Sequence, residues 1–329
     1  MNVLTKSALI ICVLFAVFSC EKRAEASKET INKELLSFAP EETNVLFYAN
    51  IAKLTSAPIL AHQLDELQTE FNKKAHKEFN TFIEITGFDP RKDVNEFLFA
   101  GNYENKAESF VFIAKGTFPE EKLVAFVKSE NAKHQDKGEI SQETYKGKTL
   151  YTFKHHKANK EKSGSVVFLD DKTMIAGETP VVKHALAQRK SLVDNAAFMK
   201  KLTRIASNDM YTFVDGESFK NKMDVKEPFK SKIEQVKNVY FGVNANETLS
   251  LSFVGECLNT VDAQNIRDAV QGIIAMARIG VSGDRDLIDF MNEVSVNHTD
   301  KEVKVNVEIT KERLNKLKSY QNKLSQAKI

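Results

Sequence analysis

The chain has 329 residues, of which 42% are hydrophobic and 28% are charged, a composition typical of a globular protein with a sizeable core. Lys and Arg number 47 against 45 Asp and Glu, so the net charge at pH 7 is only +2. A charge this small, with Lys interleaved among Glu and Asp, gives no support to a nucleic-acid partner.

The chain begins with an unbroken apolar run, Ala8 to Phe18, preceded by one cation, Lys6. The run is shorter than a transmembrane helix, which needs about 20 residues, and it fits the hydrophobic region of a signal peptide. It ends in Val17-Phe18-Ser19-Cys20. This ending resembles the bacterial lipobox, in which a small residue precedes a Cys that is diacylated and becomes the mature N-terminus.

The resemblance implies a signal peptide over residues 1–19, a lipid anchor at Cys20 and membrane attachment through that lipid. Residues 20–37 are charged and poor in aromatic side chains, which predicts a flexible tether. Ala24-Glu25-Ala26 is an alternative cleavage site for ordinary signal peptidase, which would give secretion without lipid. Glu21 stands where enterobacterial inner-membrane lipoproteins have Asp, so the resemblance favours export to the cell envelope and the outer membrane.

Cysteine usage agrees with export. Cys12 would leave with the signal peptide and Cys20 would be acylated, so Cys257 has no partner for an intramolecular disulfide in the mature chain. Cys257 lies in an alternating apolar run, which predicts a buried strand thiol.

Residues 38–207 are predicted to form a first α+β domain. In chain order the patterns indicate a strand at 44–51, a long amphipathic helix between 56 and 82, a hairpin of 96–103 and 108–115, a helix beginning near Pro119, four strands at 140–145, 148–155, 164–170 and 173–176, and helices at 179–189 and 196–207.

Residues 208–309 are predicted to repeat that order as a second α+β domain. The patterns indicate a strand at 209–215, a mainly helical stretch at 216–236, a hairpin of 237–244 and 248–257, and a helix that begins at Thr260. Phe99-Ala100-Gly101-Asn102 of the first hairpin aligns with Phe241-Gly242-Val243-Asn244 of the second. We therefore expect an α+β fold of two tandem β-α-β-β-α halves, of the split β-α-β or ferredoxin-like kind, with antiparallel sheets.

The last part of the chain carries a short helix from Asp284, a hairpin of 293–297 and 302–309, and a basic C-terminal helix over 310–329. Ser282-Gly283-Asp284, Leu287 and Phe290, followed by the apolar stretches 294–296 and 303–307, resemble the tail of a family of uncharacterised secreted bacterial proteins. The resemblance implies a fold and brings no known chemistry.

The C-terminal helix is the one candidate contact surface that the sequence offers. Its cations include Lys311, Arg313, Lys316, Lys318 and Lys323, against one anion, Glu312. A narrow apolar stripe suits docking on the body of the protein, with the cations in water. An anionic lipid or protein contact is the alternative.

No catalytic, metal-binding or cofactor-binding motif is present. There is no Gly-x-Ser-x-Gly, P-loop or Gly-x-Gly-x-x-Gly sequence, and the seven His are scattered. We therefore predict a non-catalytic binding or scaffolding lipoprotein with an envelope protein partner and no cofactor. A carrier of an apolar ligand or lipid is one alternative, because Phe97, Phe99, Phe110 and Phe112 alternate on two neighbouring strands, although such Phe also suit an ordinary core. A hydrolase without a recognisable motif is the other.

Overall fold

The computed structural model of the chain describes residues 32–74, 77–104, 107–133, 139–157, 160–187, 190–220, 231–232, 234–317 and 319–320. Unit 1 contains the described residues up to Ser56 together with Leu64–Ser207, and unit 2 contains Ala57–Gln63 and the described residues from Asn208 onward. Cys20 and the predicted signal peptide lie outside the described residues. Within the described residues, no helix is long and apolar enough to span a membrane.

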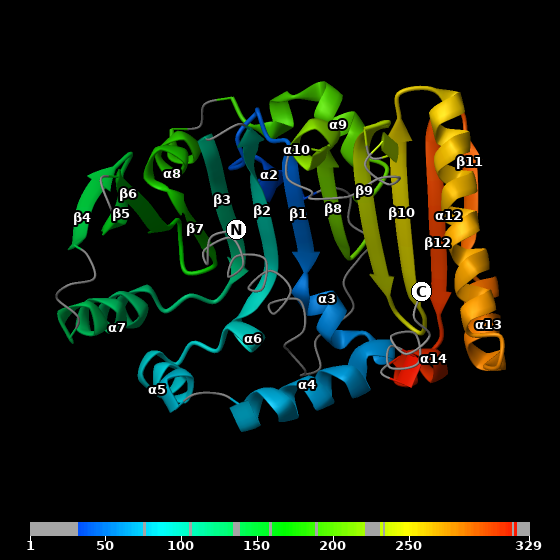
Figure 1. Cartoon of the computed structure of the whole chain (residues 1–329). Helices are drawn as coiled ribbons and strands as arrows, with labels where there is room; N and C mark the ends of the chain where they lie inside the picture. The colour runs from blue at the N-terminus through cyan, green and yellow to red at the C-terminus, as the bar shows by residue number, and fades with distance from the viewer. Residues whose placement is uncertain are drawn as a thin grey trace. The chain divides into compact units, whose positions relative to one another are not determined.

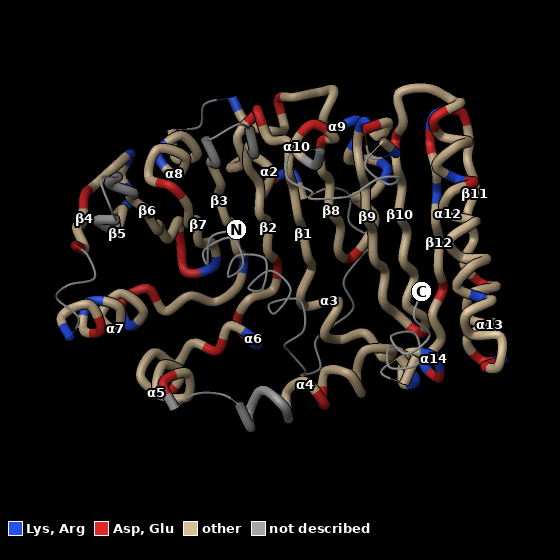
Figure 2. Tube along the Cα trace, in the orientation of Figure 1, with Lys and Arg blue, Asp and Glu red and all other residues tan. Residues whose placement is uncertain are grey.

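Unit 1 is built on an antiparallel sheet, whose described strands are neighbours in the order β1-β2-β3-β7-β6-β5-β4 (Figure 1). The strands are β1 (Val45–Asn50), β2 (Val94–Glu104), β3 (Ala107–Gly116), β4 (Glu139–Tyr145), β5 (Lys148–Lys157), β6 (Lys160–Phe168) and β7 (Thr173–Glu178). Most neighbours are consecutive in the chain and pair as hairpins, whereas β3 pairs with β7 across a long insertion. Figure 2 shows the charged residues gathered on helices and turns rather than in the middle of β1–β3.

Unit 1 contains α4 (Ala61–Lys74) from Leu64 onward and several further helices, of which the longest described has 14 residues. They are α2 (Lys33–Leu36), α3 (Ile51–Ser56), α5 (Lys77–Thr86), α6 (Pro90–Asp93), α7 (Glu120–Lys133), α8 (Thr179–Leu186), η2 (Leu192–Asp194) and α9 (Ala196–Leu202). The stretch predicted as one helix between 56 and 82 is assigned as η1 (Pro58–Leu60), α4 (Ala61–Lys74) and α5, and residues 75–76, between the last two, lie outside the described residues. Pro58 begins η1, which fits the preference of Pro for the first turn of a helix.

Helix α2 corrects the end of the flexible tether predicted over residues 20–37, whose residues 20–31 lie outside the described residues. The Asn32 side chain accepts a hydrogen bond from the Leu35 amide as the N-cap, and its Nδ2 donates to Glu96 Oε2 at 2.6 Å. Leu35 and Leu36 are fully buried. Burial of two Leu side chains stabilises this segment by about 3–6 kcal/mol, which offsets the entropy lost on ordering it.

The sheet of unit 1 is apolar on both faces. Leu98, Ile113, Ile175, Val167 and Leu150 lie side by side across β2, β3, β7, β6 and β5, and all are fully buried. Because successive strand residues point to opposite faces, the neighbours of these residues line the other face. That second face carries the candidate site.

Unit 2 has five described strands, in the neighbour order β8-β9-β10-β12-β11. They are β8 (Met210–Asp215), β9 (Val236–Ala245), β10 (Leu249–Cys257), β11 (Ser295–Thr299) and β12 (Glu302–Ile309). The helices assigned here are η1, α10 (Gly216–Lys220), α12 (Thr260–Gly280), α13 (Arg285–Asn292) and α14 (Lys311–Asn315), and α4 begins in this unit and continues in unit 1. Helix α12 packs on the sheet through Ala263, which is fully buried against a cluster that includes Cys257, Val296 and Val303.

The two units share an order of strand neighbours. In each unit three strands that are consecutive in the chain are neighbours in the sheet, and a helix follows the third strand in the chain. A later hairpin then pairs its second strand with that third strand. The resulting orders are β1-β2-β3-β7-β6 in unit 1 and β8-β9-β10-β12-β11 in unit 2. A polar pair recurs at one place, because Asn44 Nδ2 donates to Asn102 Oδ1 at 2.9 Å and Asn244 Nδ2 donates to Asn208 Oδ1 at 2.8 Å. Unit 1 additionally contains the hairpin of β4 and β5.

The α+β class and the antiparallel pairing are confirmed, whereas the ferredoxin-like arrangement is not what these units have. A split β-α-β unit contains parallel strands joined by a crossover helix. Here the registered strand pairs within each described unit are antiparallel, and β1 pairs directly with β2. The registered pairs of both units therefore join antiparallel strands, and not parallel strands connected by a crossover helix.

A candidate apolar ligand site

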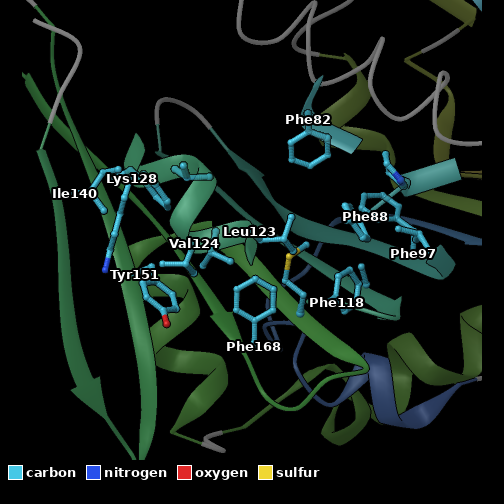
Figure 3. Close-up of a pocket in the computed structure, with 17 residues that line it drawn as sticks. Phe82, Phe88, Phe97, Phe118, Leu123, Val124, Lys128, Ile140, Tyr151 and Phe168 are labelled. Atoms are coloured by element: carbon cyan, nitrogen blue, oxygen red, sulfur yellow. The ribbon is translucent and has the colours of Figure 1, made fainter. Parts of the chain in front are cut away.

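Unit 1 contains a cavity of about 300 Å³ between the second face of its sheet and the helices α5, α6 and α7 (Figure 3). Seventeen residues line it: Phe82, Phe88, Pro90, Val94, Phe97, Ala114, Phe118, Leu123, Val124, Val127, Lys128, Ile140, Tyr151, Phe153, Val166, Phe168 and Met174. Apart from Lys128 and the Tyr151 hydroxyl, every lining side chain is apolar. Such a lining suits the apolar body of a small ligand.

The alternation of the strands places these side chains. Ala114, Met174 and Val166 each adjoin a fully buried residue of the opposite face, namely Ile113, Ile175 and Val167. Ala114 and Met174 are register partners on β3 and β7, and Met174 in turn faces Phe168 on β6. Along these strands, one side chain therefore points into the core and the next points toward the cavity.

Aromatic rings build the wall on the side of the helices. Phe82 of α5 meets Phe88 edge-on at 6.2 Å between ring centroids and Phe126 of α7 at 5.1 Å. Phe88 contacts Phe118 at 5.7 Å, and Phe118 contacts Phe168 at 6.2 Å. Edge-to-face and offset ring pairs add about 0.5–1.5 kcal/mol each to the burial of their area, so these contacts support the wall.

Tyr151 connects the sheet to α7. Its hydroxyl donates to Glu120 Oε1 at 2.8 Å, in the first turn of the helix, and its ring lines the cavity. Burial, together with the neighbouring Glu120 carboxylate, raises the pKa of Tyr151 to about 12, because both disfavour the phenolate. Tyr151 is therefore a neutral donor at physiological pH, and its hydroxyl is engaged outside the cavity.

The Phe residues singled out from the sequence lie on one face. Phe97 lines the cavity, and the rings of Phe97 and Phe112 are 5.9 Å apart. Phe99 contacts Phe112 and Phe110, each at 5.0 Å. The alternation thus indicated the correct face, although only Phe97 of the four belongs to the cavity lining.

The rest of the lining includes residues that no sequence motif singles out. The signal was present in the stretches Ser165-Val166-Val167-Phe168 and Thr173-Met174-Ile175-Ala176, where apolar residues occupy consecutive positions rather than alternate ones. Consecutive apolar residues in a strand indicate that both faces are covered. They do not indicate whether the second face meets a packed helix or a cavity.

The cations proposed as a contact surface have mixed surroundings. Arg313 forms an ion pair with Glu293, and Lys316 Nζ donates to Glu312 at 2.9 Å and to Asp286 at 3.2 Å. The two carboxylates raise the pKa of Lys316. Lys311 is exposed, and Lys318 and Lys323 lie outside the residues whose side chains are described. Arg313 of α14 (Lys311–Asn315) and Lys316, its C-cap, are therefore both engaged by carboxylates of the fold itself.

Cys257 is buried at the end of β10, which confirms the prediction of a buried strand thiol. Burial raises the pKa of the thiol to about 11, with smaller contributions from Asp262 and Glu256. A thiol with this pKa is a poor nucleophile at neutral pH. Among the described residues, no group of three or more His, Cys, Asp or Glu is arranged to hold a metal ion.

No protein-family model matches the sequence, and no curated protein matches it. Two crystal forms of TP0453 from Treponema pallidum are similar in structure. Form I has a TM-score of 0.45 and 12% identity over 89% of this chain and 99% of that one. Form IV has a TM-score of 0.46 and 10% identity over 88% of this chain and 97% of that one.

Proposed function

We propose that this protein is a non-catalytic binding protein that holds an apolar ligand in the cavity of unit 1. The observation that carries the proposal is the lining, in which fifteen of seventeen residues have wholly apolar side chains around about 300 Å³. Transfer of apolar ligand surface from water into such a site is favourable by about 25 cal/mol per Å². The preformed aromatic wall keeps the cost of ordering the site low.

The test is the binding of a neutral apolar probe, Nile red, whose fluorescence reports transfer to an apolar site. Ala114 lines the cavity and is buried, so Ala114→Leu places additional carbon atoms in the space that the probe would occupy. Val261→Leu is the matched control, because it enlarges an exposed aliphatic side chain in unit 2. We expect Ala114→Leu to weaken binding at least tenfold and the control to bind as wild type. Equal binding by both variants would contradict the proposal.

We further propose that the chain is exported and anchored to the cell envelope through a lipid on Cys20. The supporting observation is the apolar run that ends in Val17-Phe18-Ser19-Cys20, which resembles a lipobox. A tethered binding protein would present its cavity close to a source of apolar ligands. Labelling with a fatty-acid analogue in wild type and in Cys20→Ala tests the anchor, and equal labelling of the two would exclude it.

A further inference from the structure

The two ends of the cavity differ chemically. Figure 3 shows Phe88 and Phe97 at one end, Leu123 and Phe168 between, and Lys128 with Ile140 near Tyr151 at the other. Lys128 is the one cation among the seventeen lining residues. A ligand that is apolar throughout would gain nothing from it.

The register of α7 brings Lys128 to the cavity. Leu123, Val124 and Val127 line the cavity from this helix, and Lys128 lies one turn beyond Val124 on the same face. Its aliphatic stem can extend the apolar lining while its ammonium group remains at the water boundary, which is the usual behaviour of a long cationic side chain.

The Lys128 charge is not matched by a carboxylate in the described part of the chain. Its Nζ donates to Gln142 Oε1, a neutral acceptor, at 3.4 Å. Glu120 of the same helix is engaged by the Tyr151 hydroxyl and lies two turns away, about 12 Å along the axis. Glu143 of β4 is held by Lys183 at 2.7 Å. The rim at Lys128 is therefore electropositive relative to the rest of the site.

Building on the proposed function, we propose that the ligand is an anionic amphiphile, whose charged head pairs with the Lys128 ammonium and whose hydrocarbon body lies between α7 and the sheet. A carboxylate or phosphate head at the rim keeps its access to water while it gains a cation. A hydrocarbon chain directed toward Phe88 and Phe97 then meets apolar surface along its length.

The experiment compares three ligands of equal chain length, dodecanoate, dodecanol and dodecylammonium, by displacement of Nile red from the full chain. The proteins are wild type, Lys128→Gln and Lys133→Gln. Lys133 is an exposed cation of α7 that pairs with Glu130 and does not line the cavity, so it is the matched control.

We expect wild type to bind dodecanoate more tightly than the other two ligands. Lys128→Gln should weaken dodecanoate binding about fivefold and leave dodecanol binding unchanged. A fivefold loss is at the upper end of the contribution of an exposed ion pair. Added salt should weaken dodecanoate in wild type and in Lys133→Gln, and much less in Lys128→Gln. Equal loss of dodecanol and dodecanoate would assign Lys128 a packing role and overturn the proposal.

The two proposals fail in different ways. If dodecanol does not bind, or binds Ala114→Leu as well as wild type, the cavity is not the ligand site and both proposals fall. If dodecanol binds in the cavity and dodecylammonium competes as well as dodecanoate, only the assignment of the head group to Lys128 is overturned.

Discussion

Helices α7 and α12 follow equivalent strands in the two units, yet they meet their sheets differently. Helix α7 follows β3 and has no buried residue, although Leu123, Val124 and Val127 face the sheet across the cavity. Helix α12 follows β10 and packs directly on the sheet through Ala263. The same place in the strand order therefore borders a cavity in unit 1, and in unit 2 it holds a helix with a fully buried contact residue.

The difference has a source in the side chains. In unit 2, Ala263 of α12 is fully buried against the cluster that includes Cys257, Val296 and Val303, and a small residue at this contact allows the helix to approach closely. Ile266, Val270 and Ile274 of the same helix pack around this contact. Unit 1 presents large rings, Phe82, Phe118 and Phe168, and its additional hairpin of β4 and β5 extends the wall beyond β6. Leu123 and Val124 of α7 pack against a cluster that contains Phe118 and Phe168 and borders the cavity, so different side chains fill the same place in the two units.

The largest expected effect compares truncations in the two regions. Leu287→Ala removes a fully buried side chain from the unit 2 core, and we expect the free energy of unfolding to fall by about 3 kcal/mol. Met174→Ala truncates a half-buried side chain that already borders the cavity, and we expect a loss of about 1 kcal/mol. Chemical denaturation measures both. Equal losses would show that the cavity side is packed as tightly as the unit 2 core.

The opposite change, from a small to a large side chain, can be made at one Ala in each region. Ala263→Leu inserts atoms where α12 touches the sheet, and we expect a loss of about 2 kcal/mol from overpacking. Ala114→Leu directs the same atoms into the cavity, and we expect the thermal midpoint to stay the same or rise. A comparable fall of the midpoint in both variants would remove the distinction between an open and a closed region.

Two Gly residues of the β9–β10 hairpin test the polar pair that recurs in both units. A Cβ at Gly242 would come within 2.5 Å of the Asn208 side chain, so Gly242→Ala should displace Asn208 from Asn244 and cost about 1 kcal/mol. A Cβ at Gly255 would meet nothing within 4 Å, so Gly255→Ala should be neutral or stabilising. Equal stability of the two variants would indicate that the Asn pair contributes little to unit 2.

The smallest effect concerns the link between α7 and β5. The folded-state pKa of Tyr151, about 12, lies above its ordinary value of 10.0, so its contribution is complete below pH 10 and is lost as the pH rises toward 12. Tyr151→Phe keeps the ring and removes the titrating hydroxyl. We expect the difference in unfolding free energy between wild type and this variant to shrink between pH 10 and pH 12. A difference that is independent of pH would mean that the phenol ionises freely in the folded protein.

The sequence by itself determined the local features. It predicted the hairpins β2–β3 and β9–β10, because alternation and turn residues act between neighbours in the chain, and it placed Phe97, Phe99, Phe110 and Phe112 on one face. It also predicted the burial of Cys257. These features depend on a few adjacent residues and on the two-residue period of a strand.

Tertiary structure decided the rest. The pairing of β3 with β7 joins strands separated by α7 and three further strands, and no local pattern encodes it. The burial of Leu35 and Leu36 in α2 depends on surfaces that lie elsewhere in the chain. The residues that line the cavity are apolar, as core residues are, and they follow the same strand period. Composition and period alone therefore do not distinguish a cavity from a packed core. Lys128 borders the cavity because of where α7 packs in unit 1, which no local pattern of the sequence specifies.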